Sequence, residues 1–141
     1  MYTALNLSKY IVSKCIEDGE PISNLQLQKI LYYIQKKFLN DGKIAFLDDI
    51  QAWQFGPVVP EVYYFYCGYG SMPITSQYDQ YEIESEDKGI IDEIIEGKRK
   101  LRPWELVRET HKKDGAWDRT YANGNGNRKV ISCELIKADD K

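Results

Sequence analysis

The side chains that most often form enzyme and metal sites are scarce in this sequence. Its 141 residues include one histidine, His111, and three cysteines, Cys15, Cys67 and Cys133, with no CxxC pair among them. A zinc site needs several such ligands together, and a catalytic histidine needs a partner beside it. No partner for His111 is recognisable, so we interpret it as a packed or helix-capping residue. The sequence predicts no catalytic, metal-binding or cofactor-binding site.

Glycine-rich and serine-based motifs lead to the same prediction. The patterns GxGxxG, GxxxxGK[ST] and GxSxG do not occur, and Gly68-Tyr69-Gly70 is typical of a helix end. The odd, scattered cysteines fit a reducing compartment and are interpreted as inert packing residues, with Cys15 on an apolar helix face. We therefore expect a non-enzymatic protein.

The charge balance and hydropathy restrict the partners. The chain has 19 Lys and Arg against 22 Asp and Glu, a net charge of −3, whereas proteins that grip phosphates over a whole face are basic. It has no basic leader before an apolar stretch and no run of about 18 apolar residues. We expect a cytoplasmic protein without a membrane partner.

Two neighbouring stretches carry opposite charge. Residues 79–96 hold eight acids and one base, and residues 98–129 hold ten bases and four acids. Acids near a helix start and bases near its end complement the helix dipole, which is one interpretation. The alternative is a charged docking face.

Helical spacing of apolar residues dominates the chain. Leu7, Ile11 and Cys15 predict a first helix that stops before Gly19, and Ser23 with Gln26 forms a capping box for a second helix that ends near residues 40–42. Further helices are expected after Pro60, from a Ser85 cap with Ile90, Ile91, Ile94 and Ile95 as its core face, from Pro103 with Trp104 and Val107 facing inward, and from Ser132.

Only one small β element is expected. Residues 50–55 predict a short strand, broken by Gly56 and Pro57, which could pair with a second strand around Ile74. Residues 123–127, Asn-Gly-Asn-Gly-Asn, predict a mobile surface loop that only connects its neighbours. The fold class is therefore mainly α: a compact single domain over residues 1–141, with about five to six helices and a small antiparallel β element.

Aromatic residues crowd the helix after Pro60. Val59, Val62, Tyr63 and Tyr66 share its inward face, so Tyr64 and Phe65 must point elsewhere. Exposed tyrosines are frequent in protein interfaces, and base-stacking surfaces interleave aromatics with basic residues, which residues 48–70 lack. We predict a partner-binding surface that includes Tyr64, Phe65 and Tyr69. Ordinary surface exposure is the alternative, and residues 79–96 are the second candidate surface.

Two segments resemble the signature of a known family. Residues 25–33 read LQLQKILYY, similar to a helix of the form KLQKLLYYAQ, and residues 52–63 read AWQFGPVVPEVY, similar to AWxxGPVVPxVY. Residues 115–117 resemble a later GPW segment, with Ala116 in place of the proline. On these motifs the chain resembles the SocA-like antitoxin family, whose domain is called Panacea and which is common in phages, prophages and bacteria. The motif residues are Leu27, Lys29, Leu31, Tyr32, Trp53, Gly56, Pro57, Val58, Pro60, Tyr63 and Trp117.

The resemblance implies a mainly helical antitoxin that binds and neutralises a protein toxin encoded beside it. Some members of the family are thought to act as adaptors that deliver the toxin to a protease. For the signature itself we expect Trp53 to anchor the core, Gly56-Pro57 to form a turn and Pro60 to start a helix. The alternative function is a small DNA-binding regulator of its own operon that uses the basic stretch at residues 98–129. Its affinity for DNA would fall steeply with salt.

Overall fold

The structure, a computed structural model, describes residues 1–79 and 81–139. Within them the chain is mainly α, as predicted, with seven α-helices where five to six were expected. The additional helix is the short α6, which follows a glycine and has little periodicity of its own. The elements are α1 (Ala4–Glu17), α2 (Asn24–Asn40), β1 (Gln51–Trp53), β2 (Gly56–Val58), α3 (Pro60–Phe65), η1 (Cys67–Tyr69), α4 (Ser85–Lys98), α5 (Pro103–Thr110), α6 (Ala116–Tyr121), η2 (Ala122–Gly124) and α7 (Cys133–Ala138).

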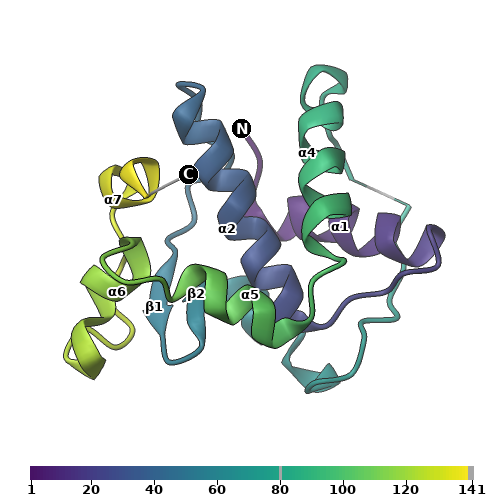
Figure 1. The fold of residues 1–141 in the computed structure, drawn as a ribbon. Helices are drawn as coiled ribbons and strands as arrows, with labels where there is room; N and C mark the ends of the chain where they lie inside the picture. The colour runs from purple at the N-terminus through teal and green to yellow at the C-terminus, as the bar shows by residue number, and fades with distance from the viewer. Residues whose placement is uncertain (80, 140–141) are drawn as a thin grey trace.

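Helix α2 is the centre of the fold. Helix α2 contacts α1, α3, α4, α5, α7 and β2. Figure 1 shows it between the α1 and α4 pair on one side and, on the other, α6, α7 and the hairpin formed by β1 and β2. The capping box predicted at Ser23 and Gln26 starts it. Leu27, Leu31 and Tyr32 of the family motif are buried along it, which explains why a single helix carries so much of the signature.

The β element differs from the prediction. Strand β1 pairs antiparallel with β2, with Gln51 opposite Val58 and Trp53 opposite Gly56. Gly56 and Pro57 therefore form the second strand rather than the break, and the turn lies at residues 54–55. Ile74 is buried but forms no strand, and its N–H donates to the Ile22 carbonyl, at 2.8 Å, in the loop before α2.

Three other local predictions meet different outcomes. Ser132 caps α7 as predicted. Helix α4, in contrast, begins at Ser85, with Glu84 as its cap residue, so the predicted Ser85 cap is displaced by one position. Trp104 is 49% exposed rather than inward, because Leu106 and Thr110 form the buried face of α5.

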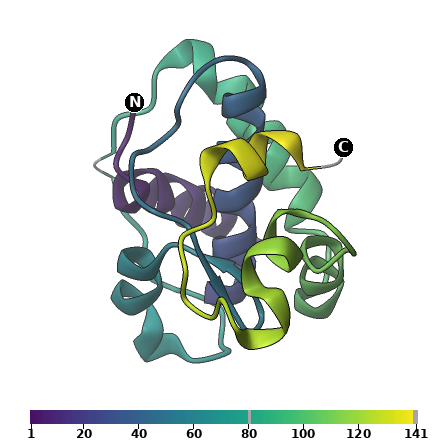
Figure 2. The ribbon, with the colours of Figure 1, turned by 90° about the vertical axis from the view of Figure 1, so that its left-hand side faces the viewer.

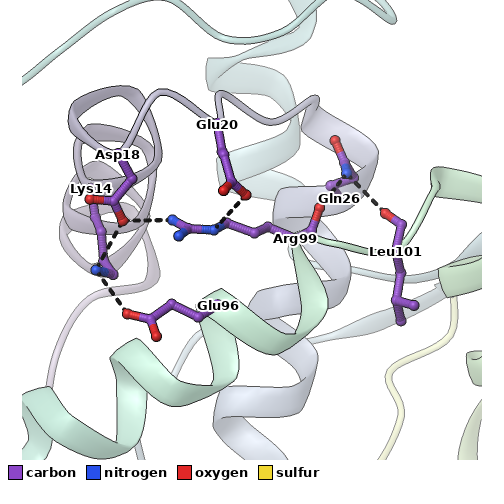
Figure 3. A network of polar contacts seen from close by, with 7 residues as sticks. All are labelled: Lys14, Asp18, Glu20, Gln26, Glu96, Arg99 and Leu101. Carbon is purple, nitrogen blue, oxygen red and sulfur yellow. Dashed lines mark hydrogen bonds and ion pairs between the residues drawn. The ribbon is translucent and has the colours of Figure 1, made fainter.

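Charged side chains join α1 to α4. Lys14 bridges Asp18 at 3.1 Å and Glu96 at 3.2 Å, while Arg99, after α4, contacts Asp18 at 2.8 Å and Glu20 at 3.2 Å (Figure 3). Each ion pair is partly exposed and contributes little stability alone, but the shared Asp18 connects the pairs into a network. Part of the opposite charge at residues 79–96 and 98–129 therefore serves helix packing.

In the described ranges, 1–79 and 81–139, no helix combines the length and hydrophobicity that crossing a membrane requires.

Candidate functional site

The motif lysine lies beneath the hairpin. Helix α2 places Lys29 with no exposed surface, and its Nζ donates to the Pro57 carbonyl at 3.2 Å. Among the residues that the structure describes, no carboxylate pairs with this amine. Burial without a counter-ion disfavours the charged form and lowers the Lys29 pKa to about 7. Lys29 therefore joins α2 to β2 as a buried hydrogen-bond donor.

The motif glycine permits this close approach. Gly56 has a φ of +122°, and a Cβ at this position would lie 2.8 Å from Cε and Nζ of Lys29 and 3.0 Å from Thr110 Oγ1. Positive φ disfavours residues with a Cβ, and the space for one is already filled. The signature glycine is therefore required by both backbone conformation and contact.

His111 is packed, as predicted. It ends α5 and stacks on Trp117, with ring centroids 3.6 Å apart and planes 3° apart. Burial, and then nearby Lys29, lower the His111 pKa. Trp117 Nε1 donates to the Trp53 carbonyl at 2.7 Å. These contacts tie α5 and α6 to the hairpin, and they use the histidine for packing.

Trp53 is not the core anchor that the signature led us to expect. Its ring is only half-buried, and it contacts Tyr63 at 5.0 Å and Tyr64 at 5.9 Å between centroids. These rings meet edge-on or tilted, as aromatic clusters favour. We call Trp53, Tyr63 and Tyr64 the aromatic cluster. It joins β1 to α3 at the surface, where Tyr63, expected on the inward face of the helix, is only half-buried.

A basic residue from a distant segment completes this surface. The Arg128 guanidinium lies 4.0 Å from the Trp53 ring centroid, and one of its nitrogens donates to the Tyr64 hydroxyl at 3.0 Å. Sequence reasoning missed Arg128, because residues 48–70 contain no base and nothing local indicates that residue 128 returns to them. The general excess of bases in residues 98–129 is the only related signal.

The segment before Arg128 does more than connect its neighbours, contrary to our expectation. Arg128 N–H donates to the Ala52 carbonyl at 2.6 Å, and its φ is +68°. Gly126 passes so close to α6 that a Cβ would lie 1.8 Å from the Thr120 carbonyl oxygen. Residues 128–131 are held against β1 and Ile50, and Figure 2 shows the yellow-green chain between α6 and α7 running beside the hairpin. The hydrogen bond to Ala52 fixes the backbone of Arg128, and with it the position from which the side chain extends.

The three predicted partner-binding residues occupy different surroundings. Tyr64 and Phe65 are 54% and 50% exposed, as their helical phase predicted. Tyr64 joins the aromatic cluster, whereas Phe65 contacts Tyr66 and has Lys9 5.7 Å from its ring centroid. Tyr69 is half-buried and its hydroxyl is hydrogen-bonded to Ser76. The structure therefore brings one of the three into the cluster.

The other chemistry-bearing residues are dispersed. Cys15 is buried as expected, but Cys67 and Cys133 are exposed, which contradicts their interpretation as packing residues. In the basic stretch, Lys98 pairs with Glu109, Lys112 with Asp139, and Arg99 with Asp18 and Glu20. Three of the ten bases of this stretch therefore form ion pairs within the described residues.

Comparison with known proteins agrees with the resemblance seen in the motifs. A family model described as "Antitoxin SocA-like, Panacea domain" matches residues 27–118, which include most of α2, the hairpin and the His111–Trp117 stack. The protein Antitoxin SocA of Caulobacter vibrioides (strain NA1000 / CB15N) is 34% identical, over 75% of this chain and 63% of the relative. No solved structure matched. With the family model covering well over half of its residues, the chain belongs to the SocA-like antitoxin family, defined by the Panacea domain.

Proposed function

We propose that this protein is an antitoxin that neutralises a protein toxin by binding it directly. It acts in the bacterial cytoplasm, and residues 1–141 form one domain. Family membership and the name of the 34% identical relative support the antitoxin role. The observation that carries direct binding is the exposure of Tyr64 and Phe65 beside the family signature. Large, stiff aromatic side chains are typical centres of protein interfaces.

Binding at this surface would neutralise the toxin by occlusion. A more specific form of this proposal is that the protein acts as a proteolytic adaptor, which binds the toxin and delivers it to a protease. The two differ in one measurable quantity, the toxin's half-life in the presence of the antitoxin, because only the adaptor shortens it.

The adjacent reading frame supplies the direct test. Expressed alone in a bacterial host it should arrest growth. Co-expression of this protein should restore growth, and the two proteins should co-purify. A neighbour that is harmless alone and does not co-purify would refute the proposal.

The double variant Tyr64→Ala with Phe65→Ala tests the surface. Truncating central interface aromatics typically weakens binding by 2 kcal/mol or more, about 30-fold, whereas exposed side chains change stability by under about 0.5 kcal/mol. We expect at least about a 30-fold rise in the Kd for the toxin, measured by titration calorimetry, with a nearly unchanged thermal midpoint.

Trp104→Ala is the matched control, because Trp104 is similarly exposed but lies on α5. It should leave toxin binding unchanged. If the double variant binds normally, or if Trp104→Ala weakens binding as much, the contact surface lies elsewhere, with the acidic residues 79–96 as the next candidate.

A further inference from the structure

A pocket of about 500 Å³ opens beside the aromatic cluster. Its size lies in the range of pockets that hold a ligand or a large side chain. Trp53, Tyr63, Phe55 and Tyr121 supply aromatic walls, and Phe55 is 60% exposed at the edge. The side chains with polar groups along the lining are Asn24, Gln54, Ser71 and Asn127. These walls offer apolar and aromatic contacts to a side chain that enters the pocket.

Arg128 is the one charged residue in the pocket lining that the structure describes. In residues 1–79 and 81–139 no carboxylate lies within ion-pair distance of it, whereas Arg99 contacts two. Its guanidinium is stacked on Trp53 and oriented by the Tyr64 hydroxyl, which uses one nitrogen. The remaining N–H groups keep the fork geometry that suits a carboxylate.

We propose that this pocket binds a segment of the toxin in which an aromatic or large aliphatic side chain lies next to a carboxylate. The apolar side chain enters between Trp53, Tyr63 and Tyr121, and the carboxylate, from Asp, Glu or a chain terminus, pairs with Arg128. This rests on the proposed function and specifies the partner chemistry at the same surface. The support is chemical complementarity: in the described part of the chain, the apolar walls have one cation, Arg128, at their edge, and no carboxylate pairs with it.

A nucleic acid fits this pocket less well. Its strand presents a phosphate at every nucleotide, and proteins that bind it track the backbone with repeated basic residues. Among the described residues that line the pocket, Arg128 supplies the one guanidinium. Binding of a nucleotide is therefore an outcome against the proposal.

Two small probes with the same ring, one with and one without a carboxylate, measure how much the carboxylate contributes to binding. N-acetyl-L-phenylalanine carries it, and N-acetyl-L-phenylalaninamide does not. We expect the acid to bind with a Kd on the order of 1 mM, as a ligand of this size allows, and the amide at least about tenfold more weakly. In NMR titrations of the full chain, the indole N–H signal of Trp53 should move, and that of exposed Trp104 should not.

Arg128→Gln should weaken binding of the acid at least about tenfold and leave binding of the amide unchanged. Arg128→Lys should be intermediate, since a lysine keeps the charge and loses the fork. Arg108→Gln is the matched control: Arg108 also stacks on a tryptophan, 4.8 Å from the Trp104 ring centroid, but does not line the pocket. All variants are checked for an unchanged thermal midpoint.

The proposal is overturned if neither probe moves the Trp53 signal, if acid and amide bind equally, if Arg128→Gln has no effect, or if adenosine monophosphate binds more tightly than the acid. These outcomes leave the antitoxin role intact, because growth rescue by the unmodified protein is measured separately. Conversely, a harmless neighbouring gene would refute the antitoxin role without changing the probe results.

Discussion

Lys29→Met is expected to stabilise the protein by about 2 kcal/mol at pH 7, because burying an amine to which the described residues supply no counter-ion costs more than burying an apolar side chain of similar size. Lys29 has no exposed surface and a pKa lowered to about 7. Methionine removes the cost of desolvating the amine but leaves the Pro57 carbonyl without its donor, which offsets about 1 kcal/mol. Urea denaturation at pH 7 measures the difference.

The same substitution should flatten the pH dependence of stability. The unfolded lysine keeps its proton to about pH 10.4, whereas the folded lysine releases it near pH 7, so between these values the unfolded chain binds more protons. The free energy of unfolding then rises with pH, by about 2 kcal/mol from pH 7 to pH 9. The measurement stops at pH 9 because buried Tyr32 has a raised pKa and opposes the rise above pH 10.

Lys37→Met on the same helix is the control, since the Lys37 side chain is exposed and pairs with Asp41 at the helix end. It should change stability by under about 0.5 kcal/mol and leave the pH dependence of the unmodified protein intact. A Lys29→Met variant that is less stable at pH 7 would show that the buried amine contributes favourably. A variant that retains the rise to pH 9 would show that Lys29 is not the source of the pH dependence.

Gly56→Ala should destabilise the protein by about 3 kcal/mol or more. The variant must place a Cβ 2.8 Å from two atoms of buried Lys29, at a φ of +122° that L-residues rarely adopt. Lys29 cannot easily move aside, because it is buried on every side. The loss is measured as a shift in the urea midpoint.

Gly42→Ala separates the conformational from the steric cost. Gly42 has a φ of +79°, and a methyl group added there would have no atom within 4 Å, so alanine should cost about 1 kcal/mol. If Gly56→Ala costs no more than Gly42→Ala, the crowding at Lys29 is not significant.

Part of the proposed partner-binding surface was predictable from local pattern. The phase of α3 placed Tyr64 and Phe65 outside because Val62 and Tyr66 are buried at the expected spacing. The neighbours of these two residues were not predictable. Tyr64 joins Trp53 through ring contact, and Phe65 turns toward Lys9, which depends on how α3 lies against the hairpin and α1.

Lys29 and Arg128 show why the rest of the site escaped sequence reasoning. A lysine in a helix is normally expected at the surface, and the family resemblance marked Lys29 without giving its environment. Arg128 follows a segment whose residues indicated only a connection, yet Gly126 allows that segment to pass against α6 and reach β1. Both environments are made by contacts between distant parts of the chain.

The amino-acid sequence by itself determined the predominance of helix, the capped start of α2 and the outward phase of Tyr64 and Phe65. These follow from capping chemistry and helical periodicity, which act between residues a few positions apart. Only the tertiary structure decided the pairing of β1 with β2, the burial of Lys29, the outward position of Trp104 and the stacking of Arg128 on Trp53. Each of these depends on which surfaces meet once the helices pack around α2, and near-neighbour preferences do not specify that choice.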